Sequence, residues 1–384
     1  MKKENKVEIS FESGPKVEVI GNIPKTYIVE FINGFNGEVE YKDTIKNNYW
    51  TKCHKEYYIP WIIKINGEVK HKLNLENKKV KITFDSKSIG DTIAWMPQVV
   101  EFQKIYNCDV TVSTFHNEWF EYLEKYEHID FIPPNVPFEA YAHYTIGWFK
   151  TDGKWDNGLK NPVQPNAIPL IKCITDILNV PFRELNYGLD FAPSKKPIKG
   201  KYICIGPRST AGIKEWPYDN WRELAELLHK DGYKVVNLSY EGFEGDHIIN
   251  KKELDWESTW NYLHHAEVFI GLGSGLSWVN WALNKHTIMI NNFIPYGYEF
   301  TKNLTKIENH NVRNNVWSNP NYVFDPGDWD WDPEFKGTED QHISQRSITV
   351  KQVYEAVKEY LTTPPEQNDD SEIFYNYLRT TRRH

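Results

Sequence analysis

Residues 79–113 read KVKITFDSKSIGDTIAWMPQVVEFQKIYNCDVTVS, and this stretch decides the fold. KVKITF at Lys79–Phe84 is typical of a β-strand, the apolar segment from Asp91 to about Tyr106 indicates a helix, and DVTVS at Asp109–Ser113 indicates a second strand. NEWFEYLEKY then predicts a helix, and HIDFI a third strand. Strands and helices that alternate in this way favour a parallel, doubly wound sheet.

The same alternation begins again after Ser194–Gly200, a polar segment with a proline that we take as a domain boundary. The expected strands are Tyr202–Gly206, Tyr233–Leu238, Glu267–Gly271 and Thr287–Ile290, and the expected helices are Asp219–Asp231, Ser277–Asn284 and Val350–Leu361. Asp219 is the predicted N-cap of the first of these helices. The sequence therefore predicts an α/β protein with two Rossmann-like domains that face a cleft.

Residues 1–78 have a different pattern. Short runs rich in β-branched and aromatic residues, such as TYIVEFI and WIIKI, alternate with turn signals at Asn33-Gly34, Asn36-Gly37 and Asn66-Gly67. We expect an all-β module here. The predicted domains are thus 1–78, 79–193, 194–362 with a C-terminal helix that crosses back over both Rossmann-like domains, and a tail at 363–384.

Composition narrows the classes of function. A net charge of −8 disfavours a nucleic-acid partner, and no apolar stretch is long enough for a membrane span. The N-terminus has no apolar region of the secretory type, so we expect a cytoplasmic protein. The four cysteines, Cys53, Cys108, Cys173 and Cys204, are not close neighbours in the sequence and are interpreted as reduced thiols, with no metal site.

The first candidate site lies in SKSIGDTIAWMP, residues 86–97, where a strand gives way to a helix. Ligands of open α/β sheets bind at the carboxyl ends of the strands, which places Asp91 at the edge of the predicted cleft. Its carboxylate could accept the proton of a hydroxyl that attacks a sugar's anomeric carbon. The alternative is that Asp91 only caps the helix and complements its dipole.

The second and third candidates also follow strands. In CIGPRSTAGIKEWP, residues 204–217, Arg208 and Lys214 supply two cations and Ser209 and Thr210 supply hydroxyls, which suits a diphosphate leaving group. An ordinary solvated loop is the alternative. The glycine-rich turn comprises Gly273, Ser274, Gly275, Leu276 and Ser277, and it opens a helix whose N–H groups favour anions, although packing alone also explains such glycines.

Two further stretches are less informative. Glu241 follows a strand and could accept hydrogen bonds from ribose hydroxyls, or it could simply lie on the surface. The segment 317–332, WSNPNYVFDPGDWDWD, gathers four aspartates from Asp325 to Asp332. A solvated turn anchored by aromatic side chains explains this segment better than a calcium loop, because the spacing of an EF-hand is absent.

Taken together, these motifs resemble the bacterial autotransporter heptosyltransferases, relatives of the lipopolysaccharide heptosyltransferases that use ADP-heptose. The resemblance runs from about residue 15 to residue 360 and depends on SIGDTIAWMP, GPRSTAGIKEWP, GLGSGLSWVNWAL, FDPGDWDWDP and SQRSIT. It implies a GT-B fold with the acceptor domain first and the nucleotide-sugar domain second. It also implies a metal-independent, inverting transfer from ADP-heptose to a protein serine, with Asp91 as base, Lys214 on the phosphates and no cofactor.

One departure concerns assembly. Members of that family carry four cysteines in the C-terminal part that bind iron and support a ring-shaped oligomer, whereas this chain has Arg313, Val316, Asp332 and Ser344 at the matching positions. We therefore expect the iron site to be lost, and a homo-oligomer stays open. The alternatives are a transferase with a lipopolysaccharide or glycan acceptor, a non-catalytic protein that binds sugar nucleotides, and a sugar-nucleotide epimerase.

Overall fold

The structure is a computed structural model that describes residues 4–165, 168–209, 214–291, 299–309 and 345–363. The chain divides into two compact units. The first comprises residues 1–87 and 95–182, and the second comprises residues 88–94 and 183–384.

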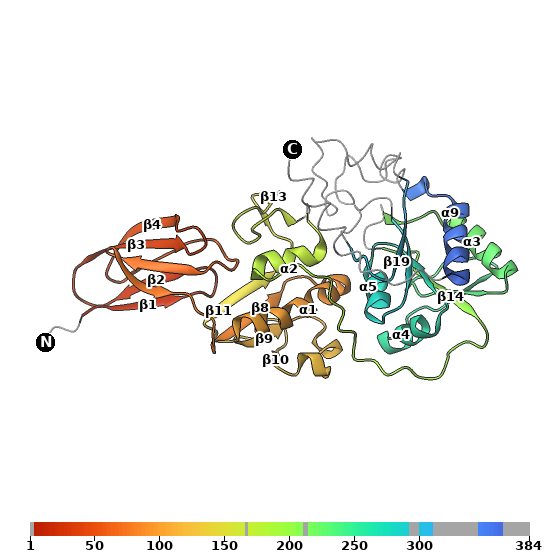
Figure 1. The fold of residues 1–384 in the computed structure, drawn as a ribbon, viewed down its shortest axis with the longest axis horizontal. Coiled ribbons are helices and arrows are strands. Elements are labelled where there is room, and N and C mark those ends of the chain that lie inside the picture. The colour runs from red at the N-terminus through yellow and green to blue at the C-terminus, as the bar shows by residue number, and fades with distance from the viewer. Residues whose placement is uncertain (1–3, 166–167, 210–213, 292–298, 310–344, 364–384) are drawn as a thin grey trace. The chain divides into compact units, whose positions relative to one another are not determined.

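The first unit begins with the expected all-β module. Its strands are β1 (Lys6–Ser10), β2 (Lys16–Ile20), β3 (Thr26–Asn33), β4 (Val39–Lys46), β5 (Tyr49–Lys52), β6 (Trp61–Ile65) and β7 (Glu68–Lys72). They form two antiparallel sheets, in the orders β1-β2-β5 and β4-β3-β6-β7 (Figure 1). Alternate side chains of these strands are buried, as at Val17 and Val19 on β2, so the core of the module lies between two half-buried sheets.

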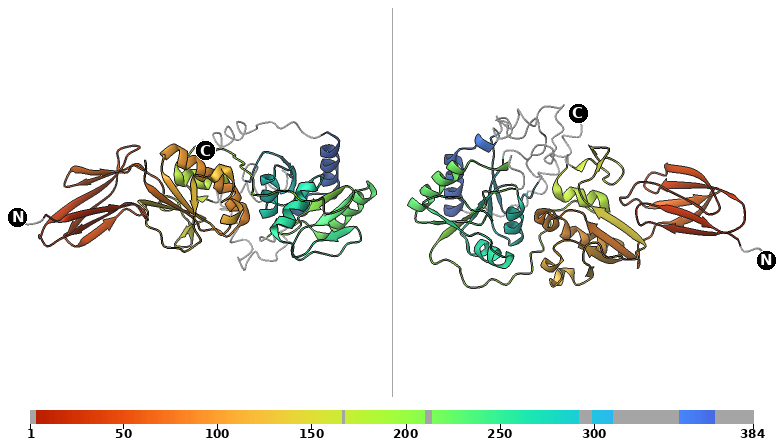
Figure 2. Two further views of the ribbon diagram at one scale, coloured as in Figure 1. Left: turned by 90° about the horizontal axis from the view of Figure 1, so that it is seen from below. Right: turned by 180° about the vertical axis from the view of Figure 1, so that it is seen from behind.

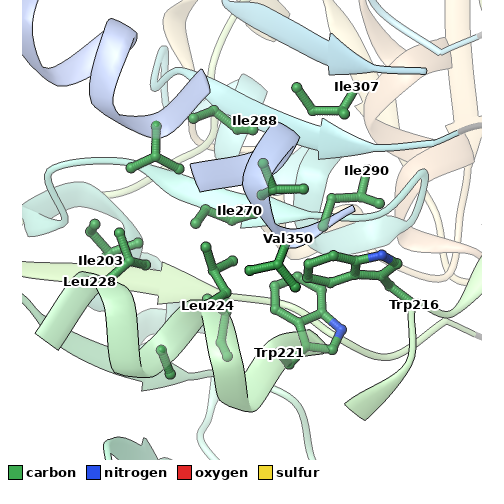
Figure 3. Packing of buried hydrophobic residues seen from close by; sticks show 14 of the residues in the cluster. Ile203, Trp216, Trp221, Leu224, Leu228, Ile270, Ile288, Ile290, Ile307 and Val350 are labelled. Carbon is green, nitrogen blue, oxygen red and sulfur yellow. The ribbon is translucent and has the colours of Figure 1, made fainter. Parts of the chain in front are cut away.

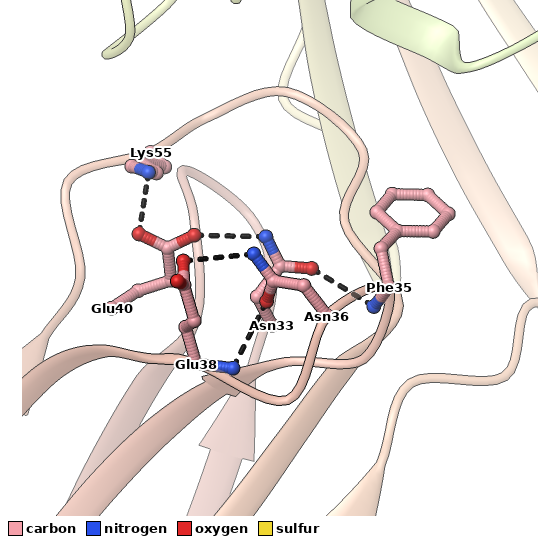
Figure 4. Close-up of polar contacts among 6 residues, drawn as sticks. All are labelled: Asn33, Phe35, Asn36, Glu38, Glu40 and Lys55. Atoms are coloured by element: carbon pink, nitrogen blue, oxygen red, sulfur yellow. Dashed lines mark hydrogen bonds and ion pairs between the residues drawn. The ribbon is translucent and has the colours of Figure 1, made fainter.

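The β3–β4 connection is held by backbone hydrogen bonds, from Asn33 to Glu38 and from Gly37 to Asn33, and also by side chains. The Asn33 amide and the Lys55 ammonium both donate to the Glu40 carboxylate, at 2.8 and 2.5 Å (Figure 4). Burial alone would raise the pKa of Glu40, but these two donors lower it below its ordinary value. Within the loop, the side chain of Asn36 accepts from the backbone N–H of Glu38 at 2.9 Å.

The α/β part of the first unit has the predicted alternation. Its elements are β8 (Lys79–Phe84), α1 (Ile89–Tyr106), β9 (Asp109–Ser113), η1 (Asn117–Trp119), η2 (Glu124–Tyr126), β10 (Ile129–Phe131), β11 (Ala142–Ile146), the short pair β12 (Lys150–Thr151) and β13 (Lys154–Trp155), and α2 (Leu170–Leu178). The first turn of α1, up to residue 94, belongs to the second unit. The strands β10-β9-β8-β11 form one parallel sheet. Strand β11 was not predicted.

The helix predicted for NEWFEYLEKY is wrong, because this segment forms only the two 3-10 turns η1 and η2. Trp119, Phe120 and Tyr126 are all buried, and their spacing also fits one face of an α-helix, so the apolar pattern does not distinguish the two structures. The Asn117 side chain accepts from the backbone N–H of Thr114 and donates to the carbonyl of Ile132, which ties the segment to its flanks.

The second unit contains one six-stranded parallel sheet in the order β16-β15-β14-β17-β18-β19. Its elements are β14 (Tyr202–Ile205), α3 (Tyr218–Lys230), β15 (Lys234–Asn237), β16 (Ile248–Asn250), α4 (Trp256–His265), β17 (Phe269–Gly271), α5 (Gly275–Ala282), β18 (Thr287–Ile290), β19 (Leu304–Ile307) and α9 (Val350–Thr362). Helices α3 and α9 lie side by side (Figure 2). The predicted crossing of a C-terminal helix over both domains stays a prediction.

The core of this unit follows from alternation along β14. Ile203 and Ile205 point into a cluster with Trp216, α3 and α9 (Figure 3). Tyr202, on the opposite face of the strand, donates its hydroxyl to the carbonyl of Tyr262 on α4 at 2.8 Å. Helices thus cover both faces of the sheet, as a doubly wound fold requires.

Two predictions about α3 have different outcomes. Trp221, Leu224, Ala225 and Leu228 are all buried on one face, as the spacing predicts. Asp219 is not the N-cap, because the helix begins at Tyr218 with Pro217 before it. Asp219 instead lies in the first turn, where it pairs with Arg222 at 2.5 Å.

No helix among the described residues is both long and apolar enough to cross a lipid bilayer.

Candidate active site

The loop after β14 is organised around Arg208. One terminal nitrogen of its guanidinium donates to the Tyr218 hydroxyl at 2.9 Å and to Glu215 at 3.2 Å, and the other pairs with Glu241 at 2.9 Å. Burial alone would lower the pKa of Arg208, but the Tyr218 hydroxyl and the two carboxylates raise it above its ordinary value. Arg208 is therefore a fixed cation at the carboxyl end of a strand.

Gly206 lets this loop leave the strand. A Cβ added there would lie 2.8 Å from the ring of Phe269, which is fully buried, so a larger residue would displace the core. Three residues later, the backbone N–H of Ser209 donates to Glu215 at 3.1 Å. Glu215 thus fixes both Arg208 and Ser209, whereas Thr210 lies outside the described residues.

Lys214 connects the loop to the glycine-rich turn. Its ammonium donates to the carbonyl of Gly273 at 3.0 Å, and its own carbonyl accepts from the buried amide of Gln345 at 2.5 Å. Gln345 also donates to the carbonyl of Ile290, at the end of β18. Two motifs that are 59 residues apart in the sequence therefore meet within the second unit.

Residues 271–277, which contain the glycine-rich turn, are buried at both ends and partly exposed at residues 274–276. A Cβ added at Gly271 would lie 2.4 Å from the Phe269 ring, and the buried Ser277 hydroxyl donates to the carbonyl of Leu272 at 2.5 Å. Both residues serve the turn itself. Ser274 is the N-cap of α5, and Gly275 and Leu276 are its first residues. All three are only partly buried, and the N–H groups at a helix N-terminus of this kind favour an anion.

Asp91 is the third residue of α1, in its partly buried first turn, and not at the N-cap. This first turn, residues 88–94, belongs to the second unit. A Cβ added at Gly90 would lie 2.8 Å from the Trp278 ring, and one added at Gly275 would lie 3.5 Å from Cβ of Ile89. The turn that carries Asp91 therefore packs on the beginning of α5.

Glu241 lies at a well-exposed position, with 66% of its side-chain surface accessible. It pairs with Arg208, so a role for Glu241 on ribose hydroxyls stays a prediction. The sequence analysis did not single out Glu215, Tyr218 or Gln345 as site residues. Glu215 lies inside the motif GPRSTAGIKEWP and Gln345 inside SQRSIT, so the motifs include both residues. Nothing in the sequence shows which atoms they bind.

Possible metal ligands lie partly inside and partly outside the described residues. Within the described residues, no group of three or more His, Cys, Asp and Glu side chains is placed to hold a metal ion. Positions 313, 316, 332 and 344, and the aspartates from Asp325 to Asp332, lie outside the described residues. All four cysteines are buried and none is in a disulfide, and none follows Cys204 in the sequence.

The chain is similar to known glycosyltransferases. The model of glycosyltransferase family 9 (heptosyltransferase) matches residues 183–323. The autotransporter heptosyltransferase Aah of Escherichia coli is 31% identical over 306 residues, which cover 76% of this chain and 77% of the relative. The inactive autotransporter heptosyltransferase BimC of Burkholderia thailandensis is 26% identical over 293 residues, which cover 73% and 68% of the two chains.

A crystal structure gives the fold of a relative. The dodecameric, iron-containing heptosyltransferase TibC of E. coli, in complex with ADP-D-β-D-heptose, aligns with a TM-score of 0.80 at 23% identity and covers 95% of this chain and 98% of its own. At this level of identity the likeness concerns the fold alone. The fold is that of a heptosyltransferase-like α/β protein with parallel sheets, preceded by antiparallel ones.

Proposed function

We propose that this chain, which belongs to the autotransporter heptosyltransferases of glycosyltransferase family 9, transfers a heptose from ADP-heptose to a hydroxyl group of a protein. Family membership makes it a glycosyltransferase. The donor is supported by the TibC complex, and a protein acceptor is supported by the names of the autotransporter-modifying relatives. A serine hydroxyl is the acceptor group we propose.

The proposed reaction is a single displacement with inversion, carried out by an enzyme of the GT-B type with two Rossmann-like domains. The acceptor hydroxyl loses its proton to the Asp91 carboxylate while its oxygen attacks the anomeric carbon. The bond from that carbon to the β-phosphate oxygen breaks, and ADP leaves with the electron pair. Arg208, Lys214 and the N–H groups of Gly275 and Leu276 offset the charge that develops on the diphosphate.

The contact between Lys214 and the carbonyl of Gly273 carries the proposal. It joins the cationic loop to the helix N-terminus, and these are the two groups that a departing diphosphate needs within reach of one another. The packing of Gly90 and Ile89 on the beginning of α5 supports a place for Asp91 near them. Glu241 and the partly buried residues Ser274–Leu276 are the proposed contacts to the rest of the donor.

The proposed assembly differs from that of TibC, which is described as dodecameric and iron-containing. The residues of this chain do not fit an iron site made of C-terminal cysteines, because no cysteine follows Cys204. The proposed mechanism uses no step through a metal. We expect a chelator to leave the rate of transfer unchanged, and an oligomer, if formed, to assemble without iron.

Asp91→Asn is the test of the mechanism. The purified chain is incubated with ADP-heptose and a serine-containing autotransporter fragment, and the mass gained by the fragment and the ADP released are measured. Asp91→Asn should abolish both while it leaves the affinity for ADP within about twofold, because the amide cannot accept a proton. Turnover of the variant near that of the wild type would refute Asp91 as the base.

The similarity to BimC, which is named as inactive, favours one alternative: a protein that binds ADP-heptose without transfer. Wild-type protein that binds ADP-heptose but leaves protein, lipopolysaccharide and small-glycan acceptors unmodified would support it. Transfer to lipopolysaccharide instead of protein would keep the enzyme and change the acceptor. An isomerised donor in the absence of acceptor would indicate an epimerase.

A further inference from the structure

Glu184 lies two residues after the first unit ends, and its carboxylate is fully used. One oxygen accepts from the indole N–H of Trp281 at 3.0 Å and from the backbone N–H of Lys302 at 2.9 Å. The other accepts from the backbone N–H and the hydroxyl of Thr301, at 2.8 and 2.7 Å. A single side chain thus joins α5 to the segment that leads into β19.

Asn186 adds a second attachment to the same tryptophan. Its amide donates to the carbonyl of Trp281 at 2.6 Å and to the side chain of Asn284 at 3.0 Å. Its own oxygen accepts from the backbone N–H of Gly188, which has a φ of +82°. Glu184 and Asn186 therefore hold both the side chain and the backbone of Trp281.

Trp281 lies at the far end of a short helix. Helix α5 is eight residues long, so its last residues lie about two turns from the glycine-rich turn that begins it. Trp281 packs edge-on against Trp278, with ring centroids 5.3 Å apart, and both contact the buried ring of Phe300. Because these rings are buried and closely packed, a shift of Trp281 moves the whole helix.

We infer that Glu184 is a positioning residue for the donor: through Trp281 it fixes α5, and thereby the N–H groups of the glycine-rich turn. This inference rests on the proposed function only in assigning a diphosphate to that turn. A helix N-terminus stabilises an anion only while its N–H groups point at it, so small displacements lower the affinity. Glu184 acts at a distance and does not touch the donor in this role.

The polarity of the site makes Glu184→Gln a sharp perturbation. All four partners of Glu184 are donors, so an ionised carboxylate satisfies them all. Glutamine has the same shape, but in one orientation its amide nitrogen would face the two N–H groups of Trp281 and Lys302. In the other it would face the backbone N–H of Thr301 beside the Thr301 hydroxyl, which can turn to accept, so at least one N–H donor loses its acceptor. We expect the variant to fold, to bind ADP about tenfold more weakly and to show a higher KM for the donor. Its kcat should also fall, because the N–H groups of the glycine-rich turn also offset the charge that develops on the leaving diphosphate.

Asp156 provides a matched control in the first unit. It also accepts four hydrogen bonds, from the N–H groups of Leu159, Lys160 and Asn161 and from the hydroxyl of Thr151. Asp156→Asn introduces the same chemical change away from α5. It should lower the melting temperature by less, because three of the four donors share one oxygen and the new amide can donate to the Thr151 hydroxyl. The affinity for ADP, measured by calorimetry, should stay within about twofold.

A double-mutant cycle with Trp281→Phe decides whether Glu184 acts through the indole. Phenylalanine removes the N–H and keeps a buried ring. If the pathway is as inferred, the loss of ADP affinity in the double variant will be clearly smaller than the product of the two single losses. Losses that multiply, or a Glu184→Gln variant with wild-type affinity, would overturn the inference.

Hydrogen exchange separates failure of this inference from failure of the proposed function. Amides of residues 273–282 should exchange faster in Glu184→Gln than in Asp156→Asn, whether or not a donor is known. If the wild type binds neither ADP nor ADP-heptose, the donor assignment fails, and the exchange rates alone decide whether Glu184 positions α5. Equal exchange in the two variants would refute the positioning role.

Discussion

Replacing Lys214 with methionine removes a charge at nearly constant length, and its effect can be worked out from the structure. The ammonium donates to the Gly273 carbonyl at 3.0 Å, and a charged donor of this kind contributes about 1.5–3 kcal/mol. Its Coulomb attraction to a phosphate about 4 Å away is larger, about 4 kcal/mol at an effective dielectric constant near 20, but desolvation offsets part of it. We therefore expect the Kd for ADP to rise roughly 10- to 100-fold.

The control for this variant is Lys234→Met. Lys234 is also in the second unit and also donates to a backbone carbonyl, that of Lys199 at 3.1 Å. It lies on β15, whereas the glycine-rich turn follows β17, and β14 separates these two strands in the sheet. Calorimetric titration with ADP at two salt concentrations should show a weaker salt dependence in Lys214→Met than in the wild type or in Lys234→Met. An ADP affinity in Lys214→Met within twofold of that of the control would refute the assignment of Lys214 to the phosphates.

Two further predictions concern stability. Gly90→Ala should lower the free energy of unfolding in urea by about 1–3 kcal/mol, because the added Cβ would lie 2.8 Å from the ring of Trp278, which is buried and donates a hydrogen bond to Glu299. Gly275→Ala is the control: its Cβ would make only an ordinary contact at 3.5 Å, so this variant should keep the stability of the wild type. Burial lowers the pKa of His286 to about 4, so a proton binds the unfolded state but not the folded one between pH 6.5 and 4. The free energy of unfolding therefore loses nothing to this histidine above pH 6.5. Between pH 6.5 and pH 4 it decreases as the pH falls, by up to about 1.4 kcal/mol per pH unit. His286→Gln should flatten the urea-unfolding profile over that range, and an unchanged slope would contradict the assignment.

The alternation of strands and helices was predictable because each element has its own period. Lys79–Phe84 and Asp109–Ser113 are strands at the predicted residues, and the Asn66-Gly67 turn has the two positive φ angles, 51° and 82°, that its sequence indicates. Strand β19 and helix α4 were missed. The residues of β19 are only partly buried for the most part, and a strand at the edge of a sheet has no strong apolar pattern.

The site was predictable only to the level of segments. Asp91 and the Arg208–Lys214 loop were chosen because each follows a strand, and that rule places segments without placing atoms. The hydrogen bond that Lys214 donates to Gly273 and the one that Trp281 donates to Glu184 join residues 59 and 97 positions apart. Such contacts depend on how the sheet is wound, which no local pattern encodes.

The surroundings of Arg208 indicate how a donor would enter. Its guanidinium has donors on three nitrogens, and the Tyr218 hydroxyl and Glu215 occupy one terminal nitrogen, while Glu241 faces the other. Glu215 is largely shielded from solvent, with 19% of its side chain accessible, whereas Glu241 is 66% accessible. An exposed ion pair contributes little to stability, so a phosphate can displace Glu241 at small cost while Tyr218 and Glu215 keep the guanidinium in place. Displacement would also free the Glu241 carboxylate to accept from the ribose, so one exchange of partners would prepare both contacts.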